Sequence, residues 1–153
     1  MTELDKLPRD EQIRLFFSRL PHGNALGVEV LEVDKGMLLM RVPFQDFMVG
    51  NPVTGFIHGG VITTLIDQTS GGAASFASDV AQQVATLDLR IDHLSAAESG
   101  HAVYARAECF KVTRYICFVR CSAFTVDEQR PVATSVSSFM KVGPLFRRRS
   151  KQG

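Results

Sequence analysis

Residues 59–77 form the longest apolar run of this 153-residue chain, with the sequence GGVITTLIDQTSGGAASFA. Strands rarely exceed about ten residues, so a run of this length predicts a helix. Few polar residues interrupt it, and the helix should therefore be buried on nearly all sides. Such a helix needs cover on every flank, and this requirement limits what the rest of the chain can form.

The N-terminal part of the chain predicts a second helix, over residues 9–20. Its apolar side chains recur at helical spacing, namely Ile13, Phe16, Phe17 and Leu20. Pro21 and the glycine at 23 are expected to end it. We assign residues 1–22 to an N-terminal helical segment that precedes the main domain.

The remaining segments are mostly strand-like. In residues 84–93 polar and apolar side chains alternate, which would place Thr86, Asp88 and Arg90 on one face. Residues 44–57 are expected to form a loop, and the short connections between the last four strands predict an antiparallel meander. The predicted strands are residues 26–34, 36–43, 84–93, 102–112, 115–126 and 131–142.

This order of elements predicts an α+β fold in which an antiparallel sheet wraps around one long central helix. A sheet covers only one side of the helix, and a second copy of the chain is the simplest cover for the other. We place the main domain at residues 23–143 and a basic tail, with Arg147–Arg149, at residues 144–153.

Composition excludes several classes of protein. The net charge is only +1, which does not suit a dedicated nucleic-acid binder. No stretch approaches the ~20 apolar residues of a membrane span, and the polar N-terminus does not resemble a signal peptide. We expect a cytoplasmic domain with neither nucleic acid nor membrane as a partner.

The cysteines and histidines suggest neither a disulfide framework nor a metal site. Cys109, Cys117 and Cys121 lie in apolar strand-like segments and are expected to be buried free thiols. No two of the four histidines stand at a metal-ligand spacing with a carboxylate or thiol. We therefore predict no metal and no cofactor.

One carboxylate, Asp67, interrupts the apolar run, and the predicted helix contains no Lys or Arg to pair with it. Burying an unpaired carboxylate is costly, which favours a functional role over a structural one. The helix begins at His58-Gly59-Gly60, where free backbone N–H groups can hold an oxyanion or simply form a tight turn. Gly59 and Asp67 lie about 12 Å apart along a helix. If both act on one carbonyl, they must belong to different subunits.

Residues 51–67, NPVTGFIHGGVITTLID, resemble the signature of the hotdog-fold acyl-CoA thioesterases, and most closely of the phenylacetic-acid-pathway (PaaI-like) group. Residues 86–97, TLDLRIDHLSAA, resemble the third strand of that family, and the likeness covers about residues 24–143. The resemblance implies a hotdog fold. The uncovered helix flank and the distance between Gly59 and Asp67 predict a homodimer, or a dimer of dimers, with active sites between subunits.

The resemblance also implies roles for five residues. Asp67 matches the helical acid that acts as general base or nucleophile, and the Gly59 N–H matches the donor to the thioester carbonyl. His58 matches a supporting residue, and Thr86 matches a strand residue that hydrogen-bonds near the acid. Asn51 matches a loop residue that orients water or substrate, although it lies seven residues before His58 where some relatives have six.

The expected substrate contacts are less specific. Gly60 would let substrate approach the backbone, and Gly71, one turn beyond Asp67, leaves space that either admits the acyl group or allows close helix packing. The CoA phosphates need cations, for which Arg90, Lys111 and Arg114 are candidates alongside the tail.

The resemblance implies hydrolysis of a small aryl- or medium-chain acyl-CoA to free acid and CoA. No GxSxG motif suggests a serine hydrolase instead. Two alternatives remain: an acyl-CoA-binding or regulatory module without catalysis, and a hotdog enoyl-CoA hydratase or dehydratase. The acyl group, the choice between CoA and acyl-carrier protein, and the route taken by Asp67 stay open.

Overall fold

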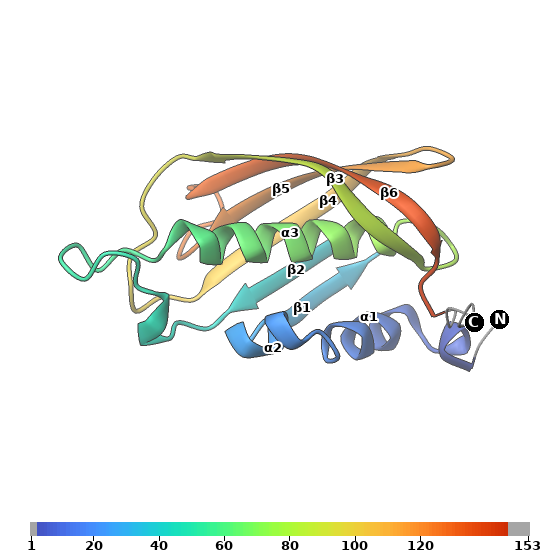
Figure 1. The fold of residues 1–153 in the computed structure, drawn as a ribbon, viewed down its shortest axis with the longest axis horizontal. Coiled ribbons are helices and arrows are strands. Elements are labelled where there is room, and N and C mark those ends of the chain that lie inside the picture. Colours follow the sequence, from blue (N-terminus) through green and yellow to red (C-terminus); the bar gives the residue numbers. More distant parts are fainter. Residues whose placement is uncertain (1–2, 147–153) are drawn as a thin grey trace, which may run out of the picture.

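The apolar run folds as the helix α3, Gly59–Ser75, and an antiparallel sheet curves around it (Figure 1). The computed structural model describes residues 3–146, so Arg147–Arg149 lie outside the described residues. The predicted α+β fold, with a sheet wrapped around a long central helix, is confirmed. The strands are β1 Glu29–Asp34, β2 Met37–Val42, β3 Gln82–His93, β4 Val103–Val112, β5 Ile116–Phe124 and β6 Ala133–Pro144.

The strand order is β1-β2-β4-β5-β6-β3, with every neighbouring pair antiparallel. The predicted meander is correct for β4, β5 and β6 but wrong for β3, which pairs with β6 and not with β4. The connection after β3 passes the N-terminal end of α3, where the Ile57 N–H donates to the Ala97 carbonyl. It is long enough to cross from one side of the sheet to the other. This crossing leaves β3 as an edge strand with one open side.

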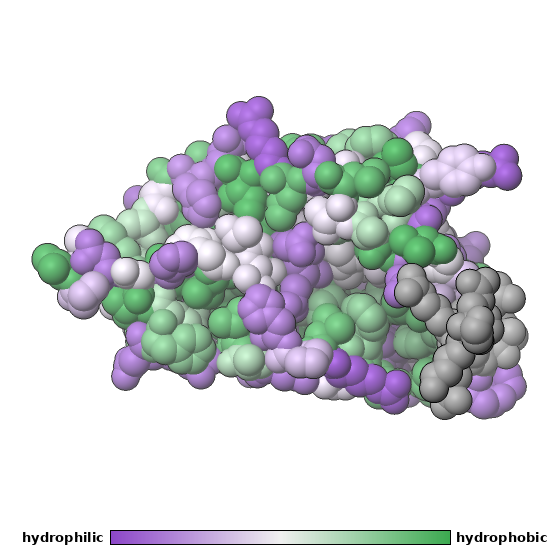
Figure 2. Space-filling view, in the orientation of Figure 1, coloured by the Kyte–Doolittle hydropathy of each residue, from purple (hydrophilic) through white to green (hydrophobic). Residues whose placement is uncertain are grey.

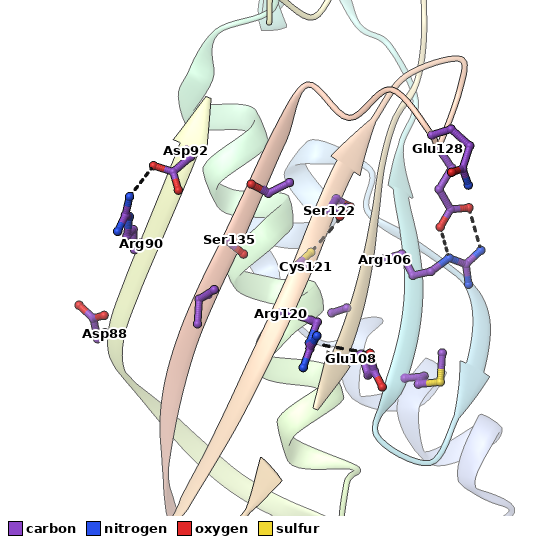
Figure 3. Close-up of a pocket in the computed structure, with 15 residues that line it drawn as sticks. Asp88, Arg90, Asp92, Arg106, Glu108, Arg120, Cys121, Ser122, Glu128 and Ser135 are labelled. Carbon is purple, nitrogen blue, oxygen red and sulfur yellow. Dashed lines mark hydrogen bonds and ion pairs between the residues drawn. The ribbon is translucent and has the colours of Figure 1, made fainter. Parts of the chain in front are cut away.

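The predicted alternation along β3 is wrong at one point, because the strand contains a β-bulge. Thr86 pairs with Phe139 and Asp88 with Ser138, so Leu87 is an extra residue without a partner. The bulge reverses which face the following residues occupy. Thr86 therefore faces α3, while Asp88 and the charged residues after it face outward (Figure 3).

The N-terminal segment forms two short helices, not the single helix predicted over residues 9–20. The first, α1, spans Arg9–Phe17, and Pro21 begins the second, α2, Pro21–Leu26, instead of ending a helix. Proline suits the first helical position because its missing N–H would have no partner there. Short 3-10 helices, η1 and η2, span Glu3–Lys6 and Asp46–Met48.

Within one chain, α3 is buried on one side and not on all sides; cover of the remaining flank by a second copy stays a prediction. The sheet covers the side that includes Leu65 and Ile66, both fully buried. A stripe at helical spacing stays partly or fully exposed: Gly60, Thr63, Thr64, Asp67, Gln68 and Gly71. Part of the remaining cover comes from this chain's own α1 and α2, which lie along one side of α3 (Figure 1).

Two adjacent glycines of α3 have different surroundings. A Cβ at Gly72 would lie 2.6 Å from Leu38 Cδ2 and 2.8 Å from Phe17 Cζ, both in the core. A Cβ at Gly71 would meet only Phe139 Cε1, at 3.5 Å, which is an ordinary contact. Close packing therefore requires glycine at position 72, whereas position 71 borders open space.

We predict opposite effects of alanine at these two positions. Gly72→Ala should destabilise the fold by about 1–3 kcal/mol, because the core must shift to admit the methyl group. Gly71→Ala should be neutral or stabilising by up to about 1 kcal/mol, because alanine is the better helix former. Urea unfolding of both variants measures the difference, and equal midpoints would contradict this account.

The cysteines behave nearly as predicted. All three are free thiols; Cys117 and Cys121 are buried and Cys109 is half-buried. Burial raises the pKa of the Cys121 thiol to about 12, so this thiol stays protonated at neutral pH. Within residues 3–146, no group of His, Cys, Asp and Glu side chains could hold a metal ion. In the same part of the chain, no helix is long and apolar enough to cross a membrane.

Candidate active site

Asp67 lies midway along α3, on the stripe that the sheet leaves uncovered. The Thr86 hydroxyl donates to Asp67 Oδ1 at 3.0 Å, which fixes the position of the carboxylate. This contact depends on the bulge in β3. With regular alternation Thr86 would lie on the same face of the strand as Asp88, which faces outward. Among the described residues, no Lys or Arg forms an ion pair with Asp67. The carboxylate is therefore anchored on one oxygen and has no cation to neutralise it.

A cavity of about 370 Å³ opens beside Asp67, between α3, β3, β6 and the N-terminal segment. Along α3 its lining runs from Asp67 to Ser75, so the acid marks the end nearest the start of the helix. On the face that shows α3, polar residues lie at the centre with apolar residues above and below them (Figure 2). The apolar wall consists of Phe16, Phe17, Leu20, Val84, Phe139 and Leu145.

Sequence reasoning missed most of this wall. The helical spacing of Phe16, Phe17 and Leu20 marks an apolar face, but nothing in the pattern shows that this face lies against α3. Gly71, in contrast, was expected to leave space beside the acid, and it does line the cavity. The cavity thus combines a carboxylate at one end with an apolar chamber, which suits an acyl group attached to a polar carrier.

The N-terminal end of α3 presents a different arrangement. His58 is the N-cap, and its Nδ1 accepts a hydrogen bond from the Gly60 N–H at 2.8 Å. A Cβ at Gly60 would lie 2.8 Å from the same nitrogen, so glycine is needed there for the cap. The Gly60 N–H is consequently not available to substrate. The Gly59 N–H, at the first helical position, has no acceptor among residues 3–146, and it points out of the helix end.

Two further residues border this helix end and were not predicted. A Cβ at Gly50 would lie 2.8 Å from His58 Cα, so glycine allows the preceding loop to pass close to the cap. The ring of His93, at the end of β3, lies beside Gly59, with Cε1 3.5 Å from the position a Cβ would take. Their sequence context gave no sign of either contact, because each depends on segments distant in the chain.

Asn51 belongs to the loop that projects beyond this end of α3 (Figure 1). Its side-chain oxygen accepts from the Val53 N–H at 2.9 Å, and its carbonyl accepts from the Gly55 N–H at 2.8 Å. Asn51 therefore stabilises a turn, and within one chain it does not lie beside Asp67. The structure thus separates the expected residues into two groups: Asp67 and Thr86 at mid-helix, and Asn51, His58 and Gly59 at the helix start.

Among the described residues, none of the predicted cations lines the cavity beside Asp67. Arg90 forms an exposed ion pair with Asp92 at 3.2 Å on the outer face of the sheet. Arg114 stacks over the Tyr115 ring, with its Cζ 5.1 Å from the ring centroid. Lys111 lies near the end of β4, where the strand is exposed. Within one chain, these residues are not arranged to bind the phosphates of a ligand held at Asp67.

A larger hollow, of about 920 Å³, lies on the outer face of the sheet, with α3 behind it (Figure 3). Its arginines already have carboxylate partners: Arg106 contacts Glu32 at 2.9 Å and Glu128 at 2.5 Å, and Arg120 approaches Glu108 at 4.0 Å. Paired surface charges of this kind leave little net field for a charged ligand. The cavity at Asp67 is therefore the better candidate for an active site.

Comparison with known proteins supports this choice. A family model described as "Thioesterase superfamily" matches residues 54–132, a range that holds the helix start, Asp67 and Thr86. The medium/long-chain acyl-CoA thioesterase YigI of Escherichia coli is 25% identical over 139 residues, which cover 82% of this chain and 88% of that protein. A Halobacterium salinarum protein named as an esterase is 38% identical over 73 residues; these cover 45% of this chain and about half, 48%, of that relative.

Solved structures show the same fold. A Pseudomonas aeruginosa protein is 40% identical, with a TM-score of 0.79 over 88% of this chain and 99% of that one. The Escherichia coli PaaI protein superposes with a TM-score of 0.79 over 89% and 94% at 17% identity. A Streptococcus mutans protein bound to acetyl CoA superposes with a TM-score of 0.68 over 77% and 90% at 23% identity. The expected hotdog arrangement is thereby confirmed.

Proposed function

Because this chain belongs to the thioesterase superfamily, we propose that it hydrolyses the thioester of a small aryl- or medium-chain acyl-CoA to the free acid and CoA. The observation that carries this proposal is Asp67, an unpaired carboxylate held by Thr86 at one end of an apolar cavity. A thioester carbonyl is already electrophilic, so a carboxylate can serve as its general base or nucleophile without a Ser-His-Asp arrangement.

In the net reaction one water is consumed, the acyl carbon exchanges its C–S bond for a C–O bond, and the sulfur leaves as CoA thiol. Asp67 can take the proton from an attacking water, or attack the carbonyl itself and be released by water. The second route passes through a mixed anhydride between the acyl group and Asp67. If water attacks the Asp67 carboxyl carbon of this anhydride, the acid from a first turnover in ¹⁸O-water carries an unlabelled Asp67 oxygen, and the label enters the carboxylate of the protein. Unlabelled acid from a single turnover therefore identifies the nucleophilic route, whereas labelled acid together with trapping of the anhydride by hydroxylamine would identify attack of water on its acyl carbon.

The carbonyl oxygen gains negative charge in the transition state and needs a donor. The Gly59 N–H suits this role, but it lies about 12 Å along the helix from Asp67 of the same chain. We therefore propose a homodimer, alone or as a dimer of dimers, in which Gly59 of one subunit serves Asp67 of the other. The open 12-residue edge of β3 supports this pairing, because an unpaired strand edge is a template for a second copy.

The proposed carrier and the proposed compartment rest on separate observations. The relative YigI is named for medium- and long-chain acyl-CoA, and the Streptococcus mutans neighbour was solved with acetyl CoA. CoA is therefore the proposed carrier, and it enters as part of the substrate and not as a cofactor. Three free cysteine thiols are in keeping with a reducing compartment, and we place the enzyme in the cytoplasm.

A substrate panel tests the proposal directly. We expect thiol release from phenylacetyl-CoA or from acyl-CoAs of about six to twelve carbons at a kcat/KM of about 10⁴ M⁻¹s⁻¹ or more. The same acyl groups on acyl-carrier protein and on a short thiol carrier should react more slowly, because part of the binding energy comes from CoA.

The panel also decides between the proposal and its alternatives. Tight acyl-CoA binding without thiol release would instead support a regulatory module. Loss of enoyl-CoA absorbance without thiol release would support a hydratase. Of the two histidines at the helix start, His58 is engaged as an N-cap through Nδ1, whereas the ring of His93 lies beside Gly59, so the enoyl-CoA measurement is the test of hydration.

A further inference from the structure

We infer that α1 forms the outer wall of the acyl cavity and that Phe16 and Leu20 limit the size of the acyl group. This inference rests on the proposed function, since it assigns the substrate's apolar part to the cavity beside Asp67. The family model begins at residue 54, so the segment that supplies this wall lies outside the matched region.

The N-terminal helix is held firmly against α3. Arg9, at the start of α1, donates to the carbonyl oxygens of Phe76 and Ser78, just beyond the end of α3. At the other end of α1, the Phe17 ring fills the space that glycine leaves at position 72. With both ends fixed, α1 is a rigid wall of the cavity and not a loose cover.

Phe16 and Phe17 have different parts in this wall. Phe17 is buried in the core, whereas Phe16 is half-buried and lines the cavity beside it. The two rings contact edge to face, with centroids 5.3 Å apart. Leu20, also half-buried, extends the same surface toward α2. Shortening Phe16 or Leu20 therefore enlarges the cavity while the anchor at Phe17 stays in place.

The size of the cavity limits what it can hold. Its volume of about 370 Å³ is at the low end of the ~300–1,000 Å³ range of small-molecule sites. Its lining along α3 runs from Asp67 to Ser75, a rise of about 12 Å along the helix. Such a space holds one aromatic ring or a medium acyl chain and leaves CoA outside. Phe16 and Leu20 line the side of this space that faces the N-terminal segment, so an acyl group that outgrows the space on that side meets these two side chains.

The test uses variants on both sides of the cavity. Phe16→Ala should enlarge it and Gly71→Leu, on the opposite side, should fill it. Leu15→Ala is the matched control, because Leu15 lies on the same helix and does not line the cavity. Phe16→Leu is a second enlarging variant that keeps an apolar side chain if the alanine variant folds poorly.

For acyl-CoAs longer than the wild-type optimum, we expect Phe16→Ala to raise kcat/KM by about tenfold or more, measured relative to kcat/KM at that optimum. Gly71→Leu should shift the preference to shorter chains. Leu15→Ala should keep the wild-type profile. An unchanged profile in both Phe16 variants, with active wild-type enzyme, would overturn the inference but not the proposed function.

A binding measurement keeps the two proposals separate. Non-hydrolysable acyl-CoA thioethers of increasing chain length report cavity size without turnover. If Phe16→Ala strengthens binding of the long thioethers by a similar factor while wild-type protein releases no thiol, the wall is supported and the hydrolase proposal fails. Equal dissociation constants for wild-type and Phe16→Ala protein at every chain length would refute the proposal that Phe16 limits the cavity.

Discussion

Asp67→Asn should lower kcat for thioester hydrolysis by about 10²–10⁴-fold, the usual contribution of a general base or nucleophile. Asparagine has nearly the same shape and can still accept the hydrogen bond from Thr86, which the native carboxylate accepts at 3.0 Å. It carries no negative charge and takes up no proton. The measurement is thiol release under saturating acyl-CoA, together with thermal unfolding to show that the fold is kept.

The matched control for this variant is Asp88→Asn, two residues beyond Thr86 on β3. The bulge turns Asp88 to the outer face of the sheet, away from the cavity. The same chemical change there should leave kcat within about twofold of wild type, as expected of a surface substitution. Near wild-type turnover in Asp67→Asn, with a folded protein, would remove Asp67 from the proposed mechanism.

Gly59→Pro should lower kcat by about 10²–10³-fold, the cost of losing one oxyanion donor. The substitution removes the Gly59 N–H, and the structure suggests that the helix tolerates it. Gly59 is the first residue of α3, where proline is favoured. His58 has φ −60° and ψ 131°, an extended conformation that a following proline requires. Turnover and helix content by circular dichroism are measured on the same sample.

Gly59→Ala separates loss of the N–H from added bulk. Alanine keeps the donor, and its Cβ would meet His93 Cε1 at an ordinary 3.5 Å within the chain. We expect the alanine variant to be clearly more active than the proline variant. Equal activities of the two would show that the space at Gly59 matters and its N–H does not.

Mixing the two inactive variants tests whether the site is shared between subunits. In a random mixture of Asp67→Asn and Gly59→Pro chains, half of the dimers are mixed, and each mixed dimer has one intact site if the site is shared. Activity should then recover to about one quarter of wild type after subunit exchange. Mass spectrometry shows whether subunits have exchanged. If the mixture stays inactive although mixed dimers have formed, the site is not shared between subunits and the dimer proposal is wrong.

The sequence indicated a candidate acid but not the side chains that surround it. Asp67 stood out because a lone carboxylate in an apolar helix has few structural explanations, and its position on α3 follows directly from helix geometry. Thr86 came from the family resemblance, while strand alternation alone placed it with the outward-facing Asp88. The bulge that corrects this depends on pairing with β6, and no local pattern shows it.

The start of α3 likewise combines a feature that the sequence predicts with features that only the structure shows. Its first residue was predicted correctly, because the apolar run begins at the two glycines. The role of His58 as N-cap, and the resulting loss of the Gly60 N–H to substrate, required the side-chain geometry. Asn51 was assigned to the site from the resemblance; within one chain it stabilises its own loop, and its role at a shared site stays a prediction.

By itself the sequence determined the α+β class, the central helix and the acid within it, because hydrophobic periodicity and a lone charge in an apolar run are visible within a few neighbouring residues. The tertiary structure decided which strand lies at the edge, where β3 changes face, and that α1 closes the cavity beside Asp67. These features depend on contacts between segments far apart in the chain. Such contacts form only when the core packs, and side-chain spacing within one segment carries no record of them.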